Sequence, residues 1–233
     1  VDAYWFGSGT PTYLIEMLRK FGMTATRLGD TMEAQRGDFD APTERLTSIV
    51  PLLYQSGYYT IKCGDPLFES YTLGIPNREV RIGLMRSLVP YYLTPDTQPT
   101  SAAIIGMARC LYKDDMDGAL RLLQEFLSTV PYCDHTNYEG HYQQVFYIIF
   151  SLLGAYVDVE VRTPRGRVDV VMRTRTTLYV IELKLGQDAD AALRQIDLKQ
   201  YPERFALCGL PVVKAGISFD AERHTLKDWK LVH

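Results

Sequence analysis

Three charged residues stand inside two otherwise apolar segments in the second half of the sequence. Asp169 lies within Val168–Met172, and Glu182 and Lys184 lie within Leu178–Leu185. Because side chains alternate between the two faces of a strand, Glu182 and Lys184 share one face. Two carboxylates beside an amine suit hydrolysis of a phosphodiester. A divalent cation held by the carboxylates polarises the phosphoryl group and lowers the pKa of a water, and the amine positions that water or stabilises the developing charge.

The register of these two predicted strands decides whether the carboxylates meet. If the turn is Thr174–Thr177, residues pair when their numbers sum to 351, so Asp169 faces Glu182. Their Cβ atoms would then be about 4.5–5.5 Å apart. Like charges in this position are destabilising, and burial without a counter-charge adds to the cost. A positive group must therefore lie between them, and Mg²⁺ or Mn²⁺ with oxygen ligands fits.

A second interpretation of the same three residues is purely structural. Lys184 alone could neutralise Asp169 and Glu182 in a cross-strand cluster of ion pairs. Structural ion pairs perturb the charges of their members as catalytic ones do, so charge alone does not separate the two cases. The residues by themselves leave both interpretations open.

The elements that must position these residues form a regular series. Apolar periodicity predicts the order α-β-β-β-α-β-β, which indicates an α/β fold. The predicted segments are Tyr138–Leu153, Tyr156–Arg162, Arg167–Met172, Leu178–Leu185, Ala189–Leu207, Val212–Ser218 and Thr225–Leu231. A membrane span needs about 20 apolar residues, and the longest apolar run is shorter, so no membrane partner is expected.

The first part of the chain is predicted to be mostly helical with one hairpin. The predicted helices are Tyr13–Phe21, Thr43–Gln55 with a kink at Pro51, and Arg78–Leu93, and the predicted strands are Tyr58–Lys62 and Tyr71–Ile75. Arg27–Pro42 is predicted to be loop or short turns. Helix, hairpin and helix in this order resemble a winged-helix unit, but no basic recognition helix for reading bases is obvious.

A linker is predicted at Thr94–Pro99, which contains two prolines and no apolar periodicity. Two further helices are predicted after it, at Ser101–Tyr112 and Met116–Val130. The linker divides the chain into two modules.

The composition is that of a globular protein, with 46% hydrophobic and 23% charged residues, which excludes a disordered or fibrous chain. Four widely spaced cysteines indicate reduced thiols and a cytoplasmic location. The chain begins at Val1 without a recognisable signal peptide, and we expect it to be a piece of a longer protein.

Positive charge gathers around the predicted hairpin, although the net charge of the chain is −3. Residues 161–175 contain five arginines and a single acid. Clustered arginines beside a metal site contact phosphates, so Arg165, Arg167 and Arg173 are candidate nucleic-acid-binding residues. A solvated hairpin tip is the alternative interpretation of this patch.

The combination D…ExK on a hairpin between two helices resembles the PD-(D/E)XK nuclease superfamily. Four further segments resemble, more narrowly, a bacterial family in which an AAA-ATPase-like domain precedes a PD-(D/E)XK nuclease-like domain: Tyr4–Thr12, Ser56–Ile61, Pro76–Val80 and Gly166–Asp169. The resemblance implies a restriction-endonuclease-like αβββαβ core, preceded by a mostly helical region with a winged-helix-like hairpin.

The same resemblance implies a domain division. Residues 1–95 would be the helical, winged-helix-like tail of the ATPase-like region, and residues 96–233 the nuclease-like domain, with its core at 136–233. The sequence contains no Walker A motif. The resemblance accounts for this, because the phosphate-binding loop would lie in an upstream ATPase-like domain.

Roles follow from the resemblance residue by residue. It implies Asp169, Glu182 and Lys184 as catalytic residues, with the two carboxylates as ligands of Mg²⁺ or Mn²⁺. The carbonyl of Leu183 and the side chain of Glu139 would complete the metal shell. For Glu139 the alternative is an exposed glutamate favoured by the helix dipole.

Gln195 and Tyr201, on the following helix, are implied accessory residues. They are six residues apart, whereas the corresponding motif of related members has four. The function implied is a metal-dependent nuclease that acts on DNA or another nucleic acid. The alternative is a catalytically inactive nucleic-acid- or protein-binding module attached to the upstream ATPase.

Overall fold

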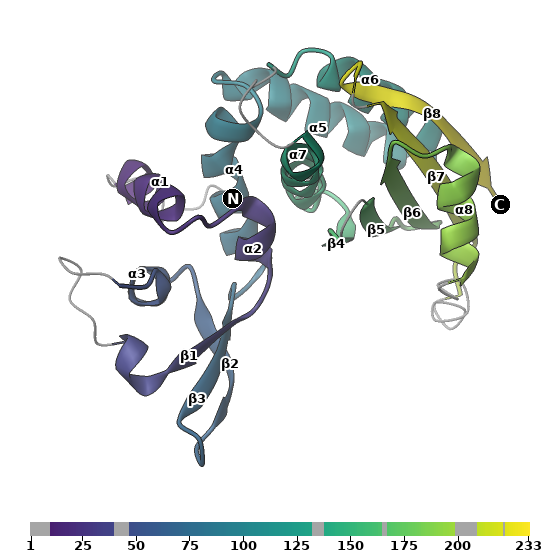
Figure 1. The fold of residues 1–233 in the computed structure, drawn as a ribbon. Helices are drawn as coiled ribbons and strands as arrows, with labels where there is room; N and C mark the ends of the chain where they lie inside the picture. The colour runs from purple at the N-terminus through teal and green to yellow at the C-terminus, as the bar shows by residue number, and fades with distance from the viewer. Residues whose placement is uncertain (1–9, 40–46, 132–137, 165–166, 199–208, 221) are drawn as a thin grey trace. The chain divides into compact units, whose positions relative to one another are not determined.

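The structure is a computed structural model that describes residues 10–39, 47–131, 138–164, 167–198, 209–220 and 222–233. The chain forms two compact units, Val1–Leu88 and Val89–His233. Figure 1 shows the course of the chain through both. Among the helices of the described ranges, none is long and apolar enough to cross a membrane.

The first unit combines short helices with a small antiparallel sheet. Its helical segments are α1 (Thr10–Lys20), α2 (Ala25–Gly29), the 3-10 helix η2 (Arg36–Phe39) and α3 (Val50–Gln55), and its strands are β1 (Met32–Gln35), β2 (Thr60–Asp65) and β3 (Ser70–Gly74). The strand order is β1-β3-β2, with both pairs antiparallel. Helix α4 (Arg78–Tyr92) follows the sheet.

Two predictions for this unit are wrong. The described part of Arg27–Pro42 is not only loop and short turns, because it contains strand β1 and most of helix α2. The sequence of β1 alternates apolar and polar residues, and Met32 and Ala34 are less exposed than Glu33 and Gln35, but the strand is only four residues long and its pairing with β3 defines it. The helix predicted over Thr43–Gln55 begins, in its described part, at Val50. Pro51 therefore lies in the first turn, where its missing N–H costs no hydrogen bond, and it does not kink the helix.

The second unit is built on a five-stranded mixed sheet. Its helices are α5 (Thr97–Leu111), α6 (Met116–Leu127), α7 (Tyr138–Leu153) and α8 (Ala189–Leu198), and its strands are β4 (Asp158–Arg162), β5 (Arg167–Arg173), β6 (Leu178–Leu185), β7 (Val212–Asp220) and β8 (Thr225–Val232). The strand order is β4-β5-β6-β7-β8, and β6 and β7 are parallel while the other neighbours are antiparallel. The predicted element order α-β-β-β-α-β-β is confirmed, and the fold is mixed α/β.

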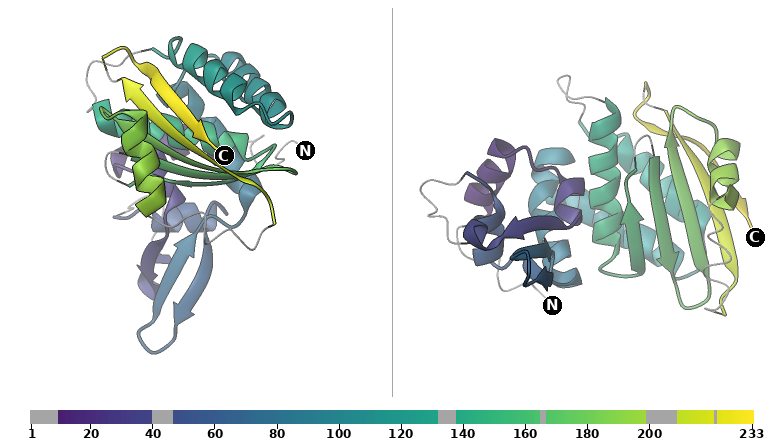
Figure 2. Two further views of the ribbon diagram at one scale, coloured as in Figure 1. Left: turned by 90° about the vertical axis from the view of Figure 1, so that its right-hand side faces the viewer. Right: turned by 60° about the horizontal axis from the view of Figure 1, so that its bottom comes forward.

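Helices α7 and α8 cover opposite faces of this sheet. Phe219 of β7 contacts Tyr142 and Phe146 of α7, with ring centroids 4.2 and 5.4 Å apart. Gly216, three residues earlier and therefore on the other face, lies against α8. A Cβ atom at Gly216 would be 2.4 Å from the carbonyl oxygen of Ala189. Figure 2, right, shows α8 in front of β7.

The linker predicted at Thr94–Pro99 is too long, because Thr97–Pro99 form the start of α5 and only Thr94–Asp96 of this segment lie between α4 and α5. Asp96 caps the helix by accepting a 2.9 Å hydrogen bond from the backbone N–H of Gln98. The buried hydroxyl of Thr94 donates to the carbonyl of Asp96. Pro99 lies in the first turn, whose N–H groups have no partner within the helix. Pro99 therefore marks a helix start and not a flexible connection.

Asp114 ties the loop between α5 and α6 to the turn between β5 and β6. Its carboxylate accepts hydrogen bonds from the hydroxyl of Thr176, at 2.6 and 2.7 Å, and from that of Thr177, at 3.2 Å. The turn itself is the predicted one, because the N–H of Thr174 donates to the carbonyl of Thr177 at 2.9 Å. The hydrogen bond from Thr176 is the main reason that the pKa of Asp114 lies below its usual value. The helical pair thus holds the β5–β6 hairpin in place.

Asp114→Asn tests this connection through the pH dependence of stability. Asparagine tolerates the left-handed backbone at this position (φ 57°), so the variant removes the charge without adding backbone strain. Because folding lowers the pKa of Asp114, its stabilising effect is fully present above the pKa of the unfolded chain. The effect is lost as the pH falls through the lower pKa of the folded protein. At neutral pH the urea midpoint should be lower for Asp114→Asn than for the wild type, and the difference should shrink as the pH falls below about 4. A pH-independent difference would contradict the assignment.

Gly216→Ala tests the close approach of α8 to β7. The added methyl group would lie 2.4 Å from the carbonyl oxygen of Ala189 and 2.7 Å from Cγ of Leu193. We expect a loss of about 1–3 kcal/mol in the free energy of unfolding, measured by urea denaturation. Gly140→Ala in α7 is the matched control, since a methyl group there meets no atom within 4 Å. That change should stabilise the helix by about 0.5–1 kcal/mol. Effects of the same sign for both variants would refute the packing described.

Candidate active site

Asp169 and Glu182 face each other on neighbouring strands of the second unit. They are paired residues in the antiparallel register of β5 and β6, which confirms the predicted pairing. Asp169 is 7% exposed and Glu182 1% exposed, so both carboxylates are buried. Two buried carboxylates in adjacent positions raise the free energy of the fold unless positive charge is near them.

Two cationic side chains occupy the next row of the same sheet face. Arg167 of β5 is paired with Lys184 of β6, two residues along each strand from the carboxylates. The Nε atom of Arg167 lies 3.4 Å from Oδ1 of Asp169. This Nε atom is buried and makes no hydrogen bond within the described ranges, so the contact is an ion pair only. Two positive and two negative side chains therefore form a compact square on this face.

Lys184 does not take the position that the structural interpretation gave it. Its Nζ atom donates a 3.1 Å hydrogen bond to Oε1 of Gln187, and Arg167 is the residue that forms an ion pair with Asp169. The cluster in which Lys184 neutralises both carboxylates is therefore not the observed arrangement. Lys184 lies in the row next to the carboxylates, and its ammonium group is held by a neutral amide.

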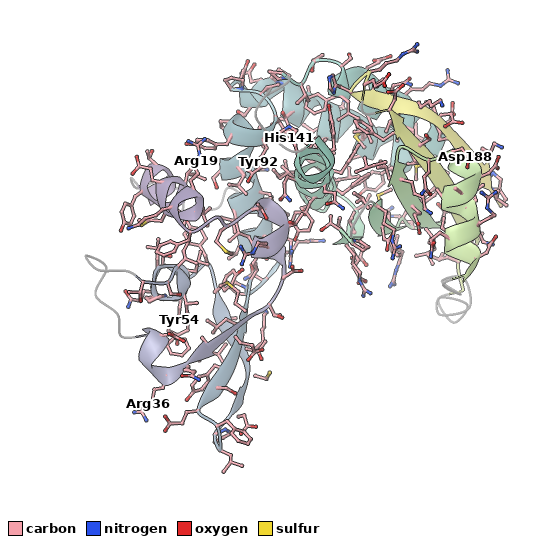
Figure 3. All side chains as sticks on the ribbon, viewed as in Figure 1. Arg19, Arg36, Tyr54, Tyr92, His141 and Asp188 are labelled. Carbon is pink, nitrogen blue, oxygen red and sulfur yellow. The ribbon has the colours of Figure 1, made fainter. Side chains whose placement is uncertain are left out.

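The connection between β6 and α8 fixes this amide. Gly186 adopts a left-handed backbone (φ 69°) that ends β6, and its N–H donates to the carbonyl of Phe219 at 3.3 Å. The hydroxyl of Ser218 donates to the backbone carbonyl of Gln187 at 2.5 Å. Asp188, labelled in Figure 3, then caps α8 by accepting a 2.6 Å hydrogen bond from the N–H of Ala191.

The sheet register extends the row of the carboxylates in both directions. Arg162 of β4 is paired with Asp169, and Gly216 of β7 is paired with Glu182. Because Gly216 has no side chain, the backbone of α8 can pack directly beside the Glu182 position. The β7 side of the carboxylate pair is thus covered by α8.

The sequence named Arg167 as a candidate nucleic-acid-binding residue but not as a neighbour of the carboxylates, and it did not point to Gln187. The place of Arg167 could have been found, because the rule that pairs Asp169 with Glu182 also pairs Arg167 with Lys184. Gln187 carries no such signal, since its position depends on a turn whose partner, β7, comes about thirty residues later.

The other predicted site residues are less clearly placed. The side chain of Leu183 is buried on the opposite face of β6, so its carbonyl is the group that could reach a ligand on the site face. Gln195 is half-buried on α8. Glu139 lies in α7, but its side chain falls outside the described part of the structure, as do Arg165 and Tyr201 altogether.

Acidic partners reduce the positive charge around the hairpin. Arg173 forms an ion pair with Asp158 at 3.9 Å, and Arg162 with Glu160 at 2.6 Å. Both acids lie on β4, just before the segment 161–175, so a count restricted to that segment overstates the local excess of positive charge. The role of these arginines in binding phosphate stays a prediction.

The donor atoms fit a hard divalent cation. Within the described ranges, no group of three or more His, Cys, Asp or Glu side chains could hold a metal ion. Magnesium, however, commonly binds one or two protein carboxylates and completes its shell with water and substrate phosphate. The buried pair of Asp169 and Glu182 is a donor set of this kind.

Comparisons with known proteins agree with this chemistry. The chain is 29% identical over 238 residues to the "Uncharacterized protein in vnfD 5'region" of Azotobacter chroococcum mcd 1. The alignment covers 96% of the chain but 45% of that relative, so the chain spans less than half of the relative's length. No solved structure matches the chain. Residues 137–229 match the family model of the PD-(D/E)XK nuclease superfamily, and this part of the chain is thus a domain of that superfamily.

Proposed function

We propose that the chain contains a metal-dependent nuclease that hydrolyses phosphodiester bonds of nucleic acid, with DNA as the substrate. The observation that carries the proposal is the pairing of buried Asp169 and Glu182, with Lys184 two residues farther along the same face. The match of residues 137–229 to the superfamily supports it. The order α7-β4-β5-β6-α8-β7 is the order expected of a restriction-endonuclease-like core.

Asp169 and Glu182 would hold Mg²⁺ or Mn²⁺, with the carbonyl of Leu183 and the side chain of Glu139 as further ligands. Bound there, the cation polarises the phosphoryl group and lowers the pKa of a water. Because the two carboxylates are buried in paired positions, both could offer donor oxygens to the same ion.

Lys184 and Arg167 act on the phosphate. In hydrolysis, the oxygen of water forms a bond to phosphorus and the bond to one sugar oxygen breaks. The ammonium group of Lys184 stabilises the negative charge on the phosphoryl oxygens or orients the water. Arg167 is paired with Lys184 across the strands, so it offers a second cation to the same phosphate.

For the rest of the chain we propose the arrangement implied by the resemblance. Residues 1–95 would be the winged-helix-like tail of an AAA-ATPase-like region, and residues 96–233 the nuclease-like domain. The sheet order β1-β3-β2, with a short first strand and a hairpin after α3, supports a winged-helix-like unit. The helix α3 contains no Lys or Arg, so a role of this helix in reading bases is not proposed. The longer relative leaves room for an upstream ATPase-like partner domain.

The proposal predicts cleavage of single- or double-stranded DNA in the presence of Mg²⁺ or Mn²⁺. Asp169→Asn, Glu182→Gln and Lys184→Met should each lower the cleavage rate at least about a hundredfold, because the first two remove a proposed metal ligand and the third removes the cation that stabilises the developing charge. Asp158→Asn is the matched control and should cleave at the wild-type rate, since Asp158 is an exposed β4 carboxylate.

A thermal melt separates loss of activity from loss of the site. Saturating Mn²⁺ should raise the Tm of the wild type and of Asp158→Asn, but not of Glu182→Gln, because only a ligand that binds the folded state stabilises it. Wild-type protein that binds Mn²⁺ but cuts neither DNA nor RNA would favour the catalytically inactive binding module. Unchanged cleavage by Asp169→Asn would refute the assignment of the site.

A further inference from the structure

We propose that Arg167 is a built-in counter-charge for Asp169, which the divalent cation must displace. The inference rests on the proposed metal site and deepens it, because it makes occupancy of the site a competition between a side chain and an ion. Binding of the cation and exposure of a phosphate-binding arginine would then be one coupled event.

The ion pair between Arg167 and Asp169 has a geometry that allows another cation to displace Arg167. Nε of Arg167 approaches Oδ1 of Asp169 to 3.4 Å, but this Nε makes no hydrogen bond within the part of the chain described. Arginine–carboxylate pairs that are built for stability are commonly bidentate, with shorter hydrogen bonds. This ion pair therefore neutralises charge without the hydrogen bond that would lock it.

The position of Arg167 is also electrostatically unfavourable. It is paired directly with Lys184, and like charges in paired positions of adjacent strands destabilise a sheet. The side chain of Arg167 is 30% exposed, so its guanidinium can turn toward solvent without passing through the core. The attraction of Asp169 holds Arg167 in this position, and a divalent cation competes for the same carboxylate.

The proposal predicts that Arg167 affects the stability of the fold differently without and with a bound metal ion. Without metal, Arg167 stabilises the fold, because it offsets part of the charge of the buried carboxylate pair. With metal bound, Arg167 is redundant beside Asp169 and lies next to Lys184, where two cations favour an anion such as a phosphate. A purely structural arginine would stabilise the fold equally in both states.

Arg173 provides a matched control on the same strand. It lies on the same face of β5 as Arg167, because the two are six residues apart. It also forms an ion pair with an aspartate, Asp158, but at 3.9 Å and on the exposed surface. Replacing Arg173 removes the same charge from the same strand without changing the carboxylate pair.

The experiment compares wild type, Arg167→Gln, Arg167→Met and Arg173→Gln by calorimetric titration with Mn²⁺ and by thermal melts with and without saturating Mn²⁺. Both Arg167 variants should bind Mn²⁺ about tenfold more tightly than wild type, since a competing cation is removed. Their Tm should lie below that of wild type in metal-free buffer, and the gap should narrow or close in Mn²⁺. Arg173→Gln should behave as wild type in both measurements.

The other outcomes separate this inference from the proposed function. Equal Mn²⁺ affinity in wild type and both Arg167 variants, with the same loss of Tm in both buffers, would overturn the inference and leave the metal site standing. Absence of Mn²⁺ binding by all four proteins would overturn the metal site and the inference together. If neither neutral variant folds, Arg167→Lys is titrated instead. This variant keeps the charge and should bind Mn²⁺ as wild type does, and tighter binding would contradict competition by charge.

Discussion

Two buried carboxylates held in paired positions on β5 and β6 constrain the rest of the second unit. Like charges at this separation repel each other and lose hydration, so the strands must be held together by forces that act elsewhere. The apolar residues on the opposite face of both strands supply such a force, since Val168, Val170, Ile181 and Leu183 are almost fully buried. The site face can be charged because the other face forms the core.

The elements around the hairpin keep the register from shifting. A slip of one residue would move the carboxylates to the apolar face, so the turn must be fixed. Asp114, from a loop of different helices, binds the hydroxyls of that turn. On the other side, α8 packs its backbone on Gly216, beside the Glu182 position, and the turn before α8 holds Gln187 against Lys184. The geometry of four charged side chains thus depends on contacts made by uncharged backbone and small residues.

The parts of this arrangement that could be predicted are local in sequence. The hairpin, its turn and the pairing of Asp169 with Glu182 follow from alternation and from a connection of four residues. The parts that could not be predicted depend on distant partners. Strand β1 alternates over four residues only, too few to predict a strand, and its pairing with β3 defines it. The first residues of α5 resemble a linker in sequence, because a capping aspartate and a proline in a first turn also occur in loops. Gln187 owes its place to Ser218 on β7.

Counting charge along the sequence and counting it on the sheet face give different results. Along the segment 161–175 the arginines outnumber the acids, but on the folded surface β4 brings Asp158 and Glu160 to Arg173 and Arg162. Arg167 is paired as well, yet its partner is buried and is itself a candidate metal ligand. A cation that enters the site therefore changes the charge seen by Arg167 and leaves the surface pairs as they are. Among the arginines that form ion pairs in the described part of this segment, Arg167 is thus the one that would become available to a phosphate, next to Lys184, when Asp169 has another partner.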